Sequence, residues 1–206
     1  MAHIPDGVLS APLLIGGALL SASALAYAVR RLEYERIPQA AVLSSALFVS
    51  SLISVPVGPS SVHLILNGLM GMVLGWAAVP AIFVELLLQA VFFGFGGLLV
   101  LGVNTLNIAL PALVCAALFG RRLRQKQIPR PFLLGAAAGG LGVLLTGVLV
   151  ALSLALSGPA FLPAAKVIPF TYLPLVIGEA VVTGAAVSFV WRVAPELLFV
   201  PEEQHG

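Results

Sequence analysis

Long runs of apolar residues, separated by short polar segments, dominate the chain. A helix that crosses a bilayer needs about 20 predominantly apolar residues. The runs do not show the alternation of apolar and polar positions that strands of a membrane barrel require. The pattern therefore predicts an all-α integral membrane protein, with spans in the runs 11–29, 37–54, 62–93, 98–119, 132–156 and 168–193.

The run 62–93 is too long for one span and short for two. Pro80 lies near its middle, and proline disfavours a continuous helix there. We therefore divide the run at 77–80, which gives about seven transmembrane helices. They form a single transmembrane domain that covers residues 1–206.

Composition supports a membrane environment and limits the chemistry. Hydrophobic residues make up 60% of the chain and charged residues only 9%, whereas a soluble domain carries roughly 25% charged residues. The net charge of +2 comes from few residues and indicates no nucleic-acid partner. Cys115 is the only cysteine, so an internal disulfide or a thiolate metal cluster is excluded.

The basic residues predict the orientation, because positively charged loops stay in the cytoplasm. With seven spans, nine of the ten basic residues fall on one side and only Lys166 on the other. The N-terminus is then outside and the C-terminus cytoplasmic. Six spans would separate the arginines, so the odd number is favoured. The nine residues are Arg30, Arg31, Arg36, Arg121, Arg122, Arg124, Lys126, Arg130 and Arg192.

Two of the three histidines, His3 and His63, fall on the predicted outer side. Taken singly, His63 fits an anchor at the membrane interface and His3 a disordered terminal residue. Together they fit a chelate, in which a free amine, a backbone amide nitrogen and a nearby imidazole surround one ion. Deprotonating the amide favours ions that prefer a square-planar arrangement, namely Ni(II) and Cu(II).

Two versions of this chelate follow from the sequence. If Met1 is removed, the Ala2 amine, the His3 amide and the His3 imidazole supply three nitrogens, and His63 supplies the fourth. If Met1 stays, its amine, two amides and the His3 imidazole already supply four nitrogens. His63 is then axial or outside the ligand set.

Three segments resemble one family, the CbiM/NikM proteins, which are the substrate-binding membrane components of energy-coupling-factor cobalt and nickel importers. Residues 3–10 (HIPDGVLS) resemble the family's N-terminus, and residues 61–68 (SVHLILNG) its second metal-binding stretch. Residues 89–97 (QAVFFGFGG), followed by 101–107 (LGVNTLN), resemble a third signature of the family.

The resemblance implies that the N-terminus inserts into the bundle from outside and that His63 is the second histidine ligand. Family members usually carry the first histidine directly after Met, whereas Ala2 intervenes here. Removal of Met1 restores the family spacing, so we expect Ala2, His3 and His63 to bind Ni(II) or Co(II) as transported substrate. Around this site, Asp6 shapes the turn of the chain. Asn67 either orients the ligands or makes an interhelical hydrogen bond.

Glu85 and Glu179 lie within predicted spans, where ionisable residues are rare and usually functional. An ion pathway, a structural hydrogen bond and a partner contact all remain open for them, and neither enters the metal list.

The chain lacks a glycine-rich phosphate loop that ends in Gly-Lys-Ser/Thr, so no ATP site is expected in it. The resemblance implies two ATPase subunits, a membrane coupling subunit and sometimes a small accessory membrane protein, in a prokaryotic cell (inner) membrane. One alternative is a self-sufficient secondary transporter, which would predict inverted repeats. Another is an intramembrane metalloenzyme, which would need an open coordination position and a general base. No enzyme activity is expected, and cobalt and nickel are not distinguished.

Overall fold

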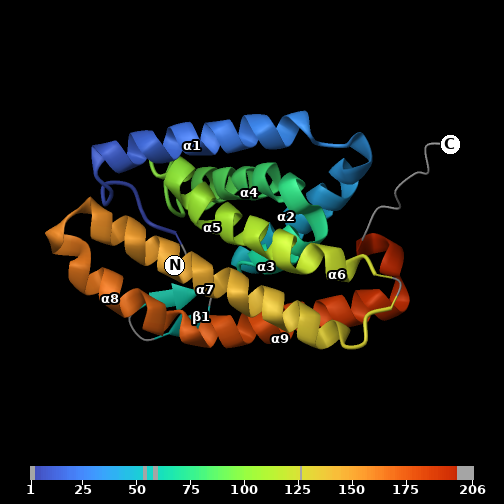
Figure 1. The fold of residues 1–206 in the computed structure, drawn as a ribbon. Coiled ribbons are helices and arrows are strands. Elements are labelled where there is room, and N and C mark those ends of the chain that lie inside the picture. The colour runs from blue at the N-terminus through green and yellow to red at the C-terminus, as the bar shows by residue number, and fades with distance from the viewer. Residues whose placement is uncertain (1–2, 53–54, 58–59, 126, 199–206) are drawn as a thin grey trace.

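The computed structural model describes residues 3–52, 55–57, 60–125 and 127–198, which form a bundle of helices running roughly in one common direction (Figure 1). The fold class is all-helical, as predicted. The helices are α1 (Ala11–Arg30), α2 (Ile37–Ser51), α3 (Asn67–Leu74), α4 (Ala78–Phe93), α5 (Leu101–Cys115), α6 (Arg121–Leu123), α7 (Pro131–Ser157), α8 (Leu162–Thr171) and α9 (Leu173–Val193).

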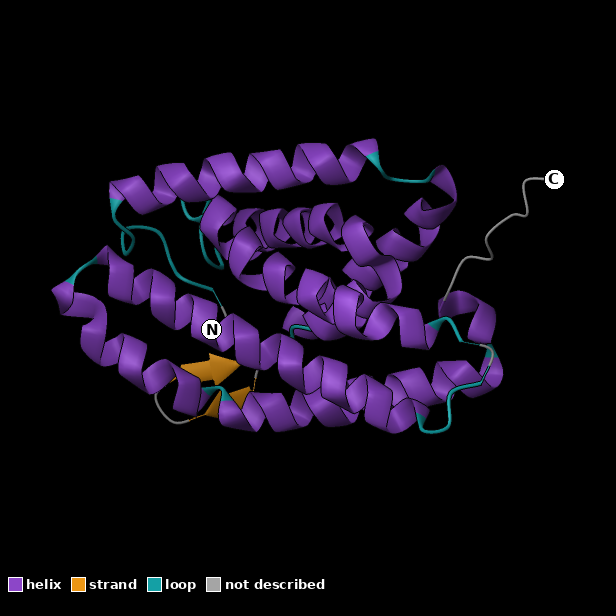
Figure 2. Cartoon of the chain, viewed as in Figure 1, coloured by secondary structure: helices purple, strands orange, loops and turns teal. Residues whose placement is uncertain are grey.

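A short hairpin is a local addition to this helical fold. Strand β1 (Val55–Val57) pairs with β2 (Ser60–Val62) in antiparallel register, with Val57 opposite Ser60 (Figure 2). The chain then continues without regular structure to α3. His63 therefore lies four residues ahead of the helix, in the segment between the hairpin and α3.

The short helix α3 occupies the centre of the bundle, and all eight of its residues are buried. Two glycines allow this position. A Cβ on Gly68 would clash with the backbone of Ala138 in α7, and one on Gly71 would clash with the backbone of Ala112 in α5. Small residues permit this close approach of helices inside a membrane. α3 is thus held on two sides, and with it the segment that carries His63.

Five helical segments of the described chain are long and apolar enough to cross a membrane, judged by length and composition. Two predicted spans are shorter. α2 has 15 residues and α3 has eight, and eight residues rise only about 12 Å, against a hydrocarbon core of about 30 Å. The count of seven spans stays a prediction.

The break between α3 and α4 lies at 75–77 rather than at the predicted 77–80. Gly75 causes it, because its φ of 59° is a conformation that residues with a side chain rarely adopt. Pro80 is the third residue of α4, where its missing N–H breaks no helical hydrogen bond.

The two ends of the bundle differ in charge. The N-terminal segment, the loop 94–100 and the turn before α8 gather at one end (Figure 1). At the opposite end lie the C-terminal ends of α1 and α9, helix α6 and the start of α7. These segments carry most of the arginines, whereas Lys166 lies in α8. Lys126 and residues 199–206 are outside the described residues.

Candidate metal site

The N-terminal segment is held in the interior by Asn104, a buried residue of α5. The Ile4 N–H donates to Asn104 Oδ1 over 3.1 Å, and Asn104 Nδ2 donates to the Ile4 carbonyl over 3.0 Å. Both backbone groups of Ile4 are thereby paired, as they would be with a neighbouring strand. The neighbouring His3 is consequently placed by the backbone and not by its own side chain.

A second attachment fixes the turn that leads into α1. The Asp6 N–H donates to the Gly96 carbonyl over 3.1 Å, and Asp6 Oδ1 accepts from the Val100 N–H over 3.0 Å. Val100 immediately precedes α5, so the carboxylate also lies at the positive end of that helix. Gly7, with a φ of 84°, makes the turn itself. Asp6 thus anchors the segment three residues away from His3.

The structure brings His3 and His63 together, although 60 positions separate them in the sequence. Their ring centroids are 5.3 Å apart, with the planes inclined by 35°, and each residue is only 6% exposed. His63 Nδ1 lies 3.0 Å from the Leu64 carbonyl. It therefore carries the proton, which leaves a lone pair on Nε2.

Three ring nitrogens of this pair have no hydrogen-bond partner within the described residues: His3 Nδ1, His3 Nε2 and His63 Nε2. Unsatisfied buried polar atoms are uncommon, and each calls for an explanation such as a bound ion or water. Here they are imidazole nitrogens, which are the commonest metal ligands in proteins. The pair is therefore suited to bind a metal ion.

The His3 imidazole is held in the neutral form. Burial, together with the charge of His63, lowers the pKa of His3 to about 3, and the nearby Gln89 side chain opposes this shift. Since metal ligands must be unprotonated to bind, the His3 ring needs to lose no proton at neutral pH.

Glu179 of α9 holds the segment that follows His63. Its carboxylate is fully buried and accepts from the Ile65 N–H and, over 2.9 Å, from the Leu66 N–H. Leu66 has a φ of 50°, which is unusual for a residue with a side chain, and the two hydrogen bonds stabilise that conformation. Glu179, whose role the sequence leaves open, makes structural hydrogen bonds at the site.

Asn67 links three helices from the start of α3. Its Nδ2 lies 2.8 Å from Thr146 Oγ1, 3.2 Å from the Ile108 carbonyl and 3.3 Å from the Gly142 carbonyl. This is the interhelical alternative considered for the residue. Its Oδ1 is buried and has no partner among the described residues.

Gln89 is a site residue that the sequence reasoning missed. It is 1% exposed, lies next to His3, and has no hydrogen-bond partner of good geometry for either amide atom within the described part of the chain. The sequence does draw attention to this position, because Gln89 is the first residue of segment 89–97, which resembles a family signature. Nothing in the spacing, however, connected it with His3.

The remaining predicted ligands, Ala2 and the alternative Met1, lie outside the described residues. Among those that are described, no cluster of three or more His, Cys, Asp or Glu side chains could hold a metal ion. Two histidines alone do not fill a coordination shell. Any tight site must therefore include ligands other than these side chains.

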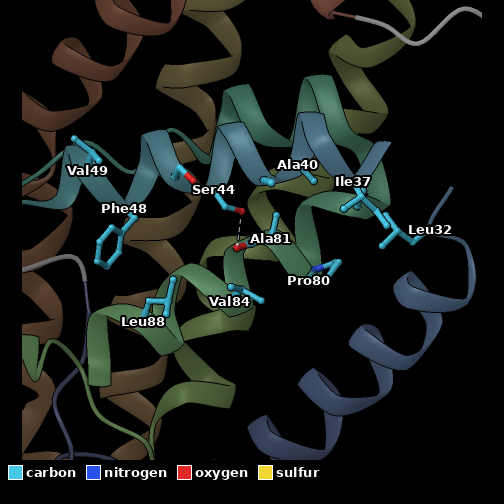
Figure 3. A pocket seen from close by; sticks show the side chains of 13 residues that line it. Leu32, Ile37, Ala40, Ser44, Phe48, Val49, Pro80, Ala81, Val84 and Leu88 are labelled. Carbon is cyan, nitrogen blue, oxygen red and sulfur yellow. Dashed lines mark hydrogen bonds between the residues drawn. The ribbon is translucent and has the colours of Figure 1, made fainter. Parts of the chain in front are cut away.

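An open groove between α2 and α4 lies away from the histidines (Figure 3). It measures about 390 Å³. Ser44 bridges it by donating to the Ala81 carbonyl over 3.1 Å. The other lining residues labelled in Figure 3 are apolar: Leu32, Ile37, Ala40, Phe48, Val49, Pro80, Ala81, Val84 and Leu88. The groove offers no ligand set for a metal ion.

Comparison with known proteins identifies the family. Residues 3–197 match the family model of CbiM, described as the cobalt uptake substrate-specific transmembrane region. The chain belongs to the CbiM family. The match includes both histidines and every helix of the bundle.

Relatives of this CbiM-family chain are named for transport. A protein of Haemophilus influenzae that is named for metal transport is 40% identical over 95% of this chain and 96% of its own length. The cobalt transport protein CbiM of Kyrpidia tusciae is 30% identical over 98% and 90%. The fused nickel transport protein NikMN of Rhodobacter capsulatus is 31% identical over 95% of this chain and 63% of its own length.

The fold agrees with a solved structure of the same kind. The crystal structure of a truncated transition metal transporter superposes with a TM-score of 0.79 and 27% identity, covering 92% of this chain and 98% of the other. Family and relatives thus indicate a membrane transport component rather than an enzyme.

Proposed function

We propose that this chain is the substrate-specific membrane component of an ATP-driven energy-coupling-factor importer, and that it captures Ni(II) or Co(II) at its N-terminus. The observation that carries the proposal is the buried pair of imidazoles, His3 and His63, with unpartnered ring nitrogens. One domain, residues 1–206, performs this task.

The ligand set follows from chelate geometry. With the mature chain beginning at Ala2, the amine, the His3 amide nitrogen and His3 Nδ1 form fused five- and six-membered rings around the ion. His63 Nε2 is free because Nδ1 faces the Leu64 carbonyl, and it completes a four-nitrogen set. Such a set suits ions with a square-planar preference.

The choice between nickel and cobalt follows from neither the ligands nor the relatives. Four nitrogens in a plane favour Ni(II), but Co(II) accepts the same ligands. The Rhodobacter capsulatus relative is named for nickel transport and the Kyrpidia tusciae relative for cobalt transport. The proposal therefore covers both ions as substrate.

We further propose seven passes through a prokaryotic cell membrane, with the N-terminus outside and the C-terminus in the cytoplasm. Residues 63–66 and α3 together make one pass, and α2 makes another. In support, arginines gather at the end of the bundle opposite the N-terminal segment. Positively charged segments stay cytoplasmic.

Cysteine labelling tests this topology. Gln125→Cys, next to α6, is expected to be protected from a membrane-impermeant thiol reagent in intact cells, and Ala160→Cys, before α8, is expected to react. Both positions are exposed at the surface of the bundle. The native Cys115 is buried, so we expect it not to react with the reagent. Labelling of Gln125→Cys in intact cells would overturn the orientation.

The proposed partners are a membrane coupling subunit and two ATPase subunits, with a small accessory membrane protein in some systems. Their requirement is tested by uptake of radioactive nickel and cobalt into cells that express this chain with or without those subunits. We expect ATP-dependent accumulation only with the full set. Accumulation driven by this chain alone would instead favour the self-sufficient secondary transporter.

A further inference from the structure

Two buried polar residues of α4 are not used by the ligand set described above. Gln89 is 1% exposed and Glu85 is 2% exposed. Gln89 Nε2, Gln89 Oε1 and Glu85 Oε1 all lack a hydrogen-bond partner of good geometry within the described residues. Because each unsatisfied buried polar atom costs free energy, three of them on one helix face need a reason.

The spacing of Glu85 and Gln89 places their side chains on one face of α4. Glu85 and Gln89 are separated by four positions in α4, so their side chains occupy the same face, with Cβ atoms about 5–6 Å apart. Side chains in a helix lean toward its N-terminus, so Gln89 leans toward the turn of Glu85. On its other side Gln89 adjoins His3.

Metal binding changes what His3 needs. The chelate with the His3 amide uses Nδ1, so Nε2 must then carry the proton. Metal-bound histidines almost always donate this second N–H to an acceptor. The adjacent buried acceptor without a partner of good geometry is the side-chain oxygen Oε1 of Gln89. The side-chain Nε2 of Gln89 can in turn donate to Glu85.

Charge gives a second reason for Glu85. A divalent ion bound by one deprotonated amide, a neutral amine and two neutral imidazoles carries a net charge of +1. A buried charge is costly unless it is paired. In the metal-bound state, an ionised Glu85 carboxylate two hydrogen bonds away would compensate this charge without occupying a coordination position.

We propose that Gln89 is a positioning residue that fixes the metal-bound form of His3 and that Glu85 supports it, in a hydrogen-bonded line His3–Gln89–Glu85 that closes when the ion binds. This proposal rests on the proposed function, because it concerns the metal-loaded state of the same site. It gives a role to the unpartnered buried atoms of His3, Gln89 and Glu85.

The test compares nickel affinity with the stability of the ion-free protein. Gln89→Leu removes the acceptor at similar size, and we expect nickel affinity to fall about 10–100-fold, as is typical for residues that orient metal ligands. We expect the melting temperature of the ion-free protein to stay unchanged or rise, because unsatisfied buried polar atoms are removed. A merely structural residue would show the reverse pattern.

Three further variants sharpen the test. Gln89→Glu keeps the acceptor oxygen and is expected to restore most of the affinity. Glu85→Gln keeps the size but removes the charge, and is expected to weaken binding by about tenfold or more. Val91→Ala, exposed on the same helix, is the control and is expected to bind normally. Wild-type affinity in Gln89→Leu or Glu85→Gln, or a lowered melting temperature of ion-free Gln89→Leu, overturns the proposal.

Failure of this inference is distinguishable from failure of the proposed function. If wild-type protein binds nickel, N-terminally acetylated protein does not, and Gln89→Leu binds normally, only the His3–Gln89–Glu85 line is wrong. If acetylated protein binds as well as wild type, the terminal chelate itself is wrong, and this inference is overturned with it.

Discussion

Blocking the terminal amine is expected to abolish tight nickel binding although every side chain stays in place. A peptide extension or acetylation converts the amine into an ordinary amide nitrogen and breaks the first chelate ring. The loss should exceed the roughly 10–100-fold that removal of an outer residue costs. Calorimetric titration of purified protein with a free terminus and of the same protein acetylated there measures it, once mass spectrometry has established the first residue of each.

The pH dependence of binding follows from the same ligands. Ligands must be unprotonated to bind, and a terminal amine has a pKa of about 8, so affinity should fall steadily as the pH is lowered below that value. Burial lowers the pKa of His3 to about 3. The His3 imidazole is therefore already neutral, and its protonation is not expected to add a step near pH 6.5. An N-terminally tagged protein that binds one ion tightly with its tag intact would refute the terminal chelate.

Replacing either histidine of the pair should be equally damaging. His3→Ala removes the chelating imidazole, and His63→Ala removes the ligand that reaches the ion from the other segment. Each variant is expected to lose stoichiometric binding of Ni(II) and Co(II) in calorimetry. His205→Ala is the matched control, since it removes the third histidine of the chain, and we expect its binding to be normal.

The two single variants also separate the two versions of the chelate. Near-normal binding by His63→Ala would show that four ligands remain without it. That result contradicts the set built on Ala2, and it favours a retained Met1 with two backbone amides as ligands.

The sequence predicts the membrane bundle well because hydropathy is a local property. Runs of apolar residues directly indicate which segments lie in lipid and which lie in water. Most predicted spans therefore differ from the helices only at their ends. The break before α4 was misplaced because Pro80 is the obvious interruption in the sequence. The actual break depends on the positive φ of Gly75, which the sequence alone does not reveal.

The site was predictable in part for a different reason. His3 and His63 are rare residues whose chemistry and family-like context suggest one task, and the structure places their rings 5.3 Å apart. Glu179 accepts hydrogen bonds from residues 113 and 114 positions away in the sequence. Asn104 accepts one from a residue 100 positions away. No sequence spacing reveals such contacts. Gln89 matters only once His3 is known to lie beside it.

X-ray absorption spectroscopy of the nickel-loaded protein tests the central claim most directly, because it reports the ligands of the ion itself. The terminal chelate predicts a square-planar nickel centre with four nitrogen ligands, two of them imidazoles. A six-coordinate centre dominated by oxygen ligands, or a spectrum unchanged by N-terminal acetylation, would contradict it.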